Sequence, residues 1–263
     1  SAGALGLLAY APASTTLAVV DGGKPEATVV DALTRLSTQL AERADDEDEE
    51  EAPKPKRKGK GKAKAPEPFD GAALGEALTP GVTILLGARD EASAAADLGV
   101  VVVLGHDDRK VVEAQATRLI AQLTGEEVQR TVLEDAGGAT LLAVGDTKVC
   151  AGVTDRALVL ALSTDATRRA LAAGAGKAPS VRDRAKLDDK VEAAGGVYVD
   201  LPRTAQWLDA FYAQALSGDE QLTAADAKAV LGPTFEALGK GPVLFAKLQP
   251  AREHAAGALE VLP

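Results

Sequence analysis

The stretch Leu98–Leu123, LGVVVVLGHDDRKVVEAQATRLIAQL, contains the pattern that decides the fold. Its first half includes the uninterrupted apolar run Val100–Leu104, whose length and β-branched residues are typical of a buried strand. Gly105 begins a polar turn, and Asp107 or Asp108 is suited to cap a following helix. In the second half, apolar residues recur at helical spacing. The stretch therefore predicts a strand, a tight turn and an amphipathic helix.

The same pattern occurs near the N-terminus. When the sequence is shifted by 83 residues, Thr15–Leu40 lies over Leu98–Leu123 without a gap. The matching residues include Val20 with Val103, Gly22 with Gly105, Val29 with Val112, Thr34-Arg35-Leu36 with Thr117-Arg118-Leu119, and Gln39-Leu40 with Gln122-Leu123. A weaker third strand–helix unit follows at Gly196–Leu216. We interpret these units as tandem strand–helix repeats that arose by internal duplication.

The remaining elements are predicted to be hairpin strands with helices between them. Turn signals at Gly137-Gly138, Gly145-Asp146 and Thr154-Asp155 separate four short strands. The predicted strands lie at 129–134, 140–144, 148–152 and 157–163, with others at 82–87, 243–248 and 256–262. The predicted helices lie at 71–78, 165–173, 182–194 and 224–238. Strands in meanders favour an α+β fold, in which helices pack on a mostly antiparallel sheet, over a parallel doubly wound sheet.

Residues 45–68 interrupt this pattern. Seven consecutive acids, 45–51, precede seven bases that are interleaved with Pro, Gly and Ala. A segment without β-branched or aromatic residues buries too little apolar surface to offset its ordering entropy. We therefore predict a first strand–helix unit at 1–44 and a disordered polyampholyte loop insertion at 45–68. The rest of the same domain is predicted at 69–263, with the second copy at about 82–175 and the third unit at about 196–263.

The net charge of −10 lies outside the two charged blocks of this loop, because their seven acids and seven bases cancel. A diffuse acidic excess disfavours a nucleic-acid binder that relies on global charge. The basic half of the loop leaves a polyanion-binding module open, with contacts through Lys54, Lys56, Arg57, Lys58, Lys60, Lys62 and Lys64. We favour a solvated loop, because the adjacent acids compete for these bases.

The sequence lacks the common catalytic motifs. Gly176-Lys177 fails as a phosphate-binding loop because Ala178 follows it, and neither a dinucleotide fingerprint nor a nucleophile elbow is present. One cysteine and two histidines exclude a cysteine-based zinc site. Only His106-Asp107-Asp108 resembles a metal or acid–base site, and its place at a strand-to-helix turn favours a helix cap. We predict no catalytic residue, cofactor-binding residue or metal site.

The other chemically distinctive residues also have structural interpretations. Cys150 lies within a strand and is expected to be a small buried or half-buried thiol. Trp207, Phe211 and Tyr212 share a helical face, where core packing is favoured over a ligand groove. His254 is expected on a solvent-facing surface.

No apolar run is long enough to span a bilayer, and Ser1–Tyr10 also lacks a basic n-region. Two interpretations of this start stay open: a mature chain after signal cleavage, or a boundary set by where the sequence was cut. A lost N-terminal anchor is compatible with both.

The segment Tyr10-Ala11-Pro12-Ala13-Ser14-Thr15, followed by an apolar strand, resembles the Tyr-x-Pro-Ala-Asp-Thr motif of a bacterial family of exported or membrane-anchored proteins. Ser14 replaces the family's acidic residue. Further similarity lies in the hairpins at 139–163, in Gly196–Leu216 and in Gly241-Pro242-Val243-Leu244-Phe245. The family has no accepted activity, so no functional residue carries over. The resemblance implies a location in the cell envelope.

These observations favour a non-enzymatic binding or scaffold protein of the cell envelope, acting in an assembly. The expected partners are another envelope protein or lipid, and the expected location is periplasmic or extracytoplasmic, with the cytoplasm as the alternative. Three alternatives stay open: a hydrolase with a site not visible in sequence, an apolar-ligand carrier, and the polyanion-binding module through 54–64.

Overall fold

The computed structural model describes residues 4–25, 29–35, 38, 67–87, 99–145, 149–187, 195–215, 224–249 and 256–262. The strands are β1 Leu17–Asp21, β2 Leu78–Leu86, β3 Val101–His106, β4 Gln129–Leu133, β5 Ala139–Ala143, β6 Cys150–Val153, β7 Ala157–Ala161, β8 Gly195–Asp200, β9 Val243–Gln249 and β10 Ala256–Leu262. The α-helices are α2 Gly71–Ala77, α3 Arg109–Thr124, α4 Thr164–Gly174, α5 Val181–Arg184, α6 Leu201–Ala215 and α7 Ala224–Gly239. Two 3-10 helices are η1 Ala4–Tyr10 and η3 Glu134–Ala136. The described residues 29–35 are helical as well.

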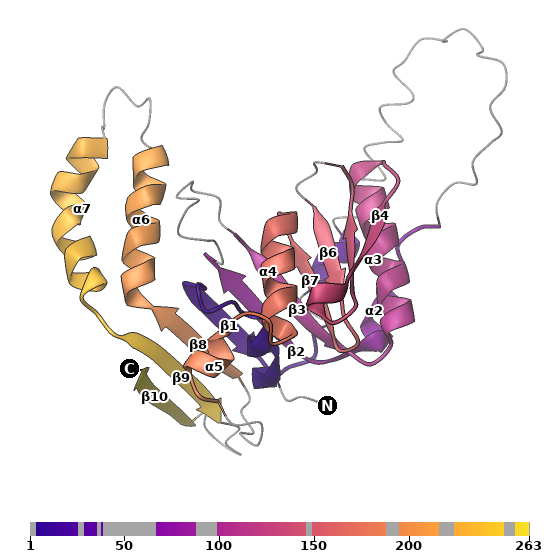
Figure 1. The fold of residues 1–263 in the computed structure, drawn as a ribbon, viewed down its shortest axis with the longest axis horizontal. Helices are drawn as coiled ribbons and strands as arrows, with labels where there is room; N and C mark the ends of the chain where they lie inside the picture. The colour runs from indigo at the N-terminus through magenta and orange to yellow at the C-terminus, as the bar shows by residue number, and fades with distance from the viewer. Residues whose placement is uncertain are drawn as a thin grey trace, which may run out of the picture.

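All ten strands of the described chain belong to one antiparallel sheet, in the order β10-β9-β8-β1-β2-β3-β7-β6-β5-β4 (Figure 1). The α+β prediction is therefore confirmed. The strands of the first two strand–helix units, β1 and β3, both pair with β2 near the middle of the sheet. The third unit begins with β8, which pairs with the other side of β1.

The turn that defines the repeat forms as predicted in its second copy. Asp108 caps α3, because its side chain accepts a hydrogen bond from the backbone N–H of Val111 at 3.1 Å. The helix ends at Gly125, whose φ of 68° lies in the left-handed region that glycine tolerates. The two ends of α3 are therefore specified locally.

The sheet buries apolar side chains on both faces. Along β3, Val101 and Val103 belong to a core with η1, α4 and α5, whereas Leu104 belongs to a second core with α2 and α3. This alternation is the period-2 geometry of a strand covered on both sides. The short helix η1 therefore packs over the centre of the sheet, and Leu8 at its middle is fully buried.

Strand β2 begins earlier than the predicted 82–87. It runs through Pro80 and Gly81, and its pairing with β3 is irregular between Leu78 and Val82. An irregularity of this kind accommodates Pro80, which has no backbone N–H group, and Gly81, whose φ is 122°. Pro80 and Gly81, two residue types that are common in turns, thus lie inside the strand.

The helix predicted at 182–194 is wrong in its length. Helix α5 starts with a capping box between Ser180 and Asp183 and ends at Arg184. Lys186 then has a φ of 49°, in the left-handed region, so the chain leaves the helical path there. Residues 188–194 lie outside the described residues.

The division of the chain into 1–44, 45–68 and 69–263 stays a prediction. Most of the loop, 45–66, lies outside the described residues. At its C-terminal end, Glu67 forms an ion pair with Arg118 of α3.

Candidate functional site

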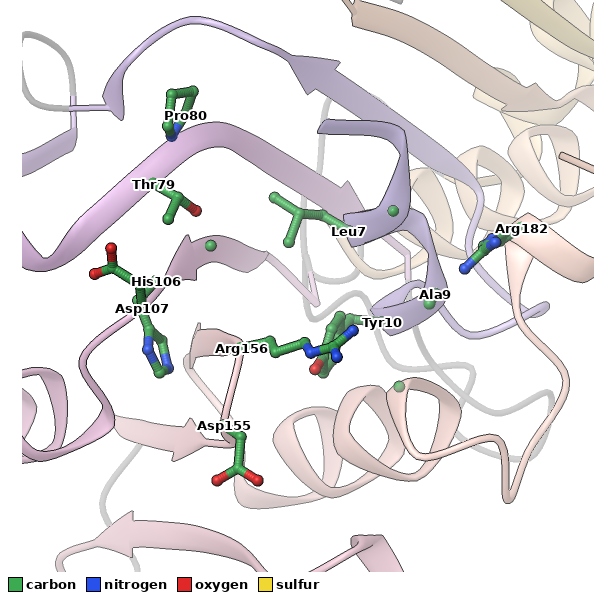
Figure 2. A pocket seen from close by; sticks show the side chains of 13 residues that line it. Leu7, Ala9, Tyr10, Thr79, Pro80, His106, Asp107, Asp155, Arg156 and Arg182 are labelled. Carbon is green, nitrogen blue, oxygen red and sulfur yellow. The ribbon is translucent and has the colours of Figure 1, made fainter. Parts of the chain in front are cut away.

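A cavity of about 800 Å³ lies where η1, β2, β3 and the turn between β6 and β7 meet. Figure 2 shows side chains from these separate segments around it. The cavity is lined by Gly6, Leu7, Ala9, Tyr10, Thr79, Pro80, Gly105, His106, Asp107, Asp155, Arg156, Gly174 and Arg182. The lining combines short apolar side chains with charged ones, and its volume falls in the range of small-molecule sites.

One wall is the turn between β6 and β7. The hydroxyl oxygen of Thr154 accepts hydrogen bonds from the backbone N–H groups of Arg156 and Ala157, at 3.2 and 2.9 Å. This local arrangement holds the turn in place. The Tyr10 hydroxyl lies 3.0 Å from the same Thr154 oxygen, so η1 is tied to the turn across the cavity. Burial is the main cause that raises the pKa of Tyr10, which therefore stays protonated at neutral pH.

The opposite wall depends on a close approach between β3 and β2. A Cβ added at Gly105 would lie 2.5 Å from the hydroxyl oxygen of Thr79. Glycine therefore lets the irregular start of β2 lie against the end of β3. The next residue, His106, is held by a backbone hydrogen bond from its N–H to the carbonyl of Arg156 at 3.0 Å.

His106 is the most unusual side chain in the lining. It is only 4% exposed, and neither ring nitrogen makes a well-formed hydrogen bond within the described residues. Burial lowers its pKa, while hydrogen bonding of the ring to the backbone of Thr154 and Ala157, in less than ideal geometry, acts in the opposite direction. The imidazole is therefore neutral at pH 7, with one N–H donor and one acceptor nitrogen.

The acidic residue of the turn is already paired. Asp155 accepts a hydrogen bond from Arg109 at 2.7 Å. The same guanidinium donates to the carbonyl of Gly138 at 2.8 Å and to Thr140 at 3.1 Å. Arg109 therefore links the start of α3 to two turns of the sheet and neutralises Asp155.

Arg156 differs from Arg109. It lies on the same turn, is exposed, and forms no ion pair with any residue that the structure describes. Figure 2 shows its side chain extending toward Tyr10, with Arg182 of α5 on the far side of that ring. Hydrogen bonds from Ser180 are the main cause that lowers the pKa of Asp183, and the adjacent Arg182 lowers it further.

The predicted His106-Asp107-Asp108 cluster is divided by the turn. Asp108 is the helix cap, and Figure 2 shows the Asp107 carboxylate and the His106 ring on opposite sides of the chain. Across the described residues, no three His, Cys, Asp or Glu side chains are grouped to hold a metal ion. The predicted cap is confirmed for Asp108, and the three side chains do not converge.

The prediction for Cys150 is confirmed. The thiol is buried, lies 3.0 Å from the Thr167 hydroxyl, and has a pKa raised mainly by burial. Trp207 is half-buried on α6. The side chains of Phe211 and Tyr212, together with His254 and the bases of the loop from Lys54 to Lys64, lie outside the described residues.

Sequence reasoning missed Tyr10 and Arg156 as lining residues. Tyr10 stood out only as part of a family resemblance, and Arg156 follows a turn signal that says nothing about what the turn faces. The apolar character of Ala4–Tyr10 is the local feature that indicates packing of this segment against another element.

Comparison with protein-family models, with curated proteins and with solved structures gives no match. The resemblance to the exported bacterial family therefore stays an expectation. Within the described ranges, no helix combines the length and apolar character needed to cross a bilayer.

Proposed function

We propose that this protein is a non-enzymatic binding protein that holds a small polar molecule in the cavity between η1 and the β6–β7 turn. The observation that carries the proposal is the buried imidazole of His106, which lines the cavity and makes no well-formed hydrogen bond through either ring nitrogen within the described residues. Buried polar groups in folded proteins are nearly always hydrogen-bonded. A ligand that bonds to this ring satisfies that requirement.

Binding explains the lining better than the alternatives from the sequence. A hydrolase needs titratable groups that converge on one bond, but Tyr10 is bound to Thr154 and Asp155 to Arg109. An apolar-ligand carrier needs a lining with few charges, whereas this one includes Arg156 and Asp107. The polyanion hypothesis concerns loop residues outside the described part of the chain.

The test is a titration of the full ¹⁵N-labelled chain with five probes: glucose, butyramide, butyrate, inorganic phosphate and putrescine. We expect at least one probe to cause saturable shifts of the amide signals of Gly105, His106 and Arg156. Ala9 lines the cavity, so Ala9→Trp fills it and is expected to abolish these shifts.

The matched control is Arg168→Trp, which places the same ring on an exposed position of α4. It is expected to bind like the unmodified chain. The proposal fails if no probe saturates at these amides, or if Ala9→Trp binds as well as Arg168→Trp while its spectrum shows a folded protein.

We also propose a location in the cell envelope, supported by the resemblance of Tyr10–Thr15 to an exported family. Fractionation of source cells should recover the full-length protein with the periplasm or membranes. Recovery with the cytosolic proteins alone would contradict this location.

A further inference from the structure

The charges around the cavity leave one cation without a counterion. Asp155 is paired with Arg109 at 2.7 Å, and Arg182 has Asp183 beside it. Arg156 projects from the same turn as Asp155 and has no ionic partner within the described ranges. A guanidinium group in this setting is suited to bind a planar anion, to which it donates two parallel hydrogen bonds.

The imidazole of His106, which makes no well-formed hydrogen bond within the described residues, belongs to the same wall. The backbone N–H of His106 is bonded to the carbonyl of Arg156, so the two residues are adjacent across the β3–β7 end. Both side chains line the cavity, one exposed and cationic, the other buried and neutral. An anion placed between them gains a charged partner from Arg156 and an N–H donor from the imidazole.

Resting on the binding function proposed above, we propose that the ligand is a small molecule with a carboxylate group, held by the Arg156 guanidinium and the His106 imidazole. The short apolar side chains of Leu7, Ala9 and Pro80 then contact the rest of the ligand. This assignment names the ligand's chemical class and the two residues that recognise it.

A singly charged carboxylate fits this cavity better than a doubly charged phosphate. Asp107 and Asp155 also border the cavity, and within the described ranges an arginine pairs with Asp155 but not with Asp107. A second negative charge would meet the Asp107 carboxylate without another unpaired cation to balance it. Figure 2 shows Asp107 directed away from the imidazole, which leaves the His106 side open to one anionic group.

The arrangement also implies a pH dependence. The groups near His106 are Asp107 on its own strand, Arg109 on α3, Asp155 and Arg156 on the β6–β7 turn, and Tyr10 on η1. Burial lowers the pKa of His106 in the free protein, and a bound carboxylate favours the protonated ring. Binding of the carboxylate is therefore accompanied by uptake of a proton by His106. The affinity for the carboxylate rises as the pH falls toward the pKa that His106 has in the free protein.

The test is calorimetric titration of the full chain with butyrate, its neutral analogue butyramide, and inorganic phosphate. We expect butyrate to bind about tenfold more tightly than butyramide, since an ion-assisted hydrogen bond to arginine is made only by the acid. Arg156→Gln is expected to remove this difference. The control Arg168→Gln removes an arginine from an exposed part of α4 and should leave it unchanged.

His106→Gln supplies a second readout. We expect it to keep a preference for butyrate through Arg156 but to lose the rise in affinity that accompanies a fall in pH toward the lowered pKa of His106. Equal binding of butyrate and butyramide, tighter binding of phosphate, or an unchanged preference in Arg156→Gln would overturn the assignment. If butyramide still binds and Ala9→Trp blocks it, the binding function stands while the carboxylate assignment fails.

Discussion

Leu8→Ala is expected to lower the free energy of unfolding by about 3 kcal/mol, the usual cost of emptying a fully buried leucine site. Leu8 has no exposed surface and belongs to the core that also contains Leu85, Leu171 and Val181. A 3-10 helix of seven residues has little stability of its own, so this packing is what holds η1 on the sheet. The midpoint of thermal unfolding should fall by roughly 6 to 12 °C.

The measurement is chemical unfolding followed by circular dichroism, with Leu162→Ala as the control. Leu162 is 57% exposed after β7, so its truncation should change the unfolding free energy by no more than about 0.5 kcal/mol. If both variants unfold at the same denaturant concentration, η1 does not pack on the sheet as described. Because η1 forms a wall of the cavity, Leu8→Ala should also weaken probe binding.

The second large effect is expected at Asp200, at the end of β8. Its carboxylate is 1% exposed and accepts a hydrogen bond from Arg184 at 2.6 Å. It also accepts a hydrogen bond from the backbone N–H of Arg203 at 3.0 Å, in the first turn of α6. The residue therefore joins α5, β8 and α6 through one buried charge.

Asp200→Ala should lower the free energy of unfolding by about 3 kcal/mol, since it removes charged hydrogen bonds and leaves two arginines facing an apolar side chain. Asp200→Asn should cost roughly half as much, because the amide oxygen still caps the helix but the charge is lost. The measurement is again denaturant unfolding of each variant.

The matched control for Asp200 is Glu236→Ala. Glu236 and Lys240 form an ion pair of the same 2.6 Å length, but both side chains are about 70% exposed, at 70% and 74%. Exposed pairs of this kind contribute about 0.5 kcal/mol or less. Equal losses for Asp200→Ala and Glu236→Ala would mean that the Asp200 carboxylate is hydrated rather than buried.

The sequence was sufficient to predict what depends on neighbouring residues. Asp108 could be predicted as a cap because capping involves residues three positions apart, and the three strand–helix units have periodic apolar patterns. Cys150 could be predicted as a buried or half-buried thiol because it lies within a strand and no residue near it in the sequence would depress the pKa of the thiol. These features require no knowledge of which strands pair.

The cavity could not be predicted in this way. Its residues come from η1, β2, β3, the β6–β7 turn and α5, and only the strand order brings them together. The left-handed conformation of Lys186, which follows the end of α5, has no local signal, because lysine rarely adopts it. The passage of β2 through Pro80 and Gly81 likewise depends on its partner, because the pairing with β3 is irregular between Leu78 and Val82.

The position of η1 has a consequence for synthesis of the chain. This apolar segment leaves the ribosome before the strands on which it packs, and its contacts extend to β8 at Gly195–Asp200. At about 5 to 20 residues per second, translation needs roughly 10 to 40 seconds to supply that strand. Throughout this interval the nascent chain presents Leu5, Leu7 and Leu8 without their full set of partners. A chaperone that binds short apolar segments would therefore find its target in η1, and would release it only when β8 has been made.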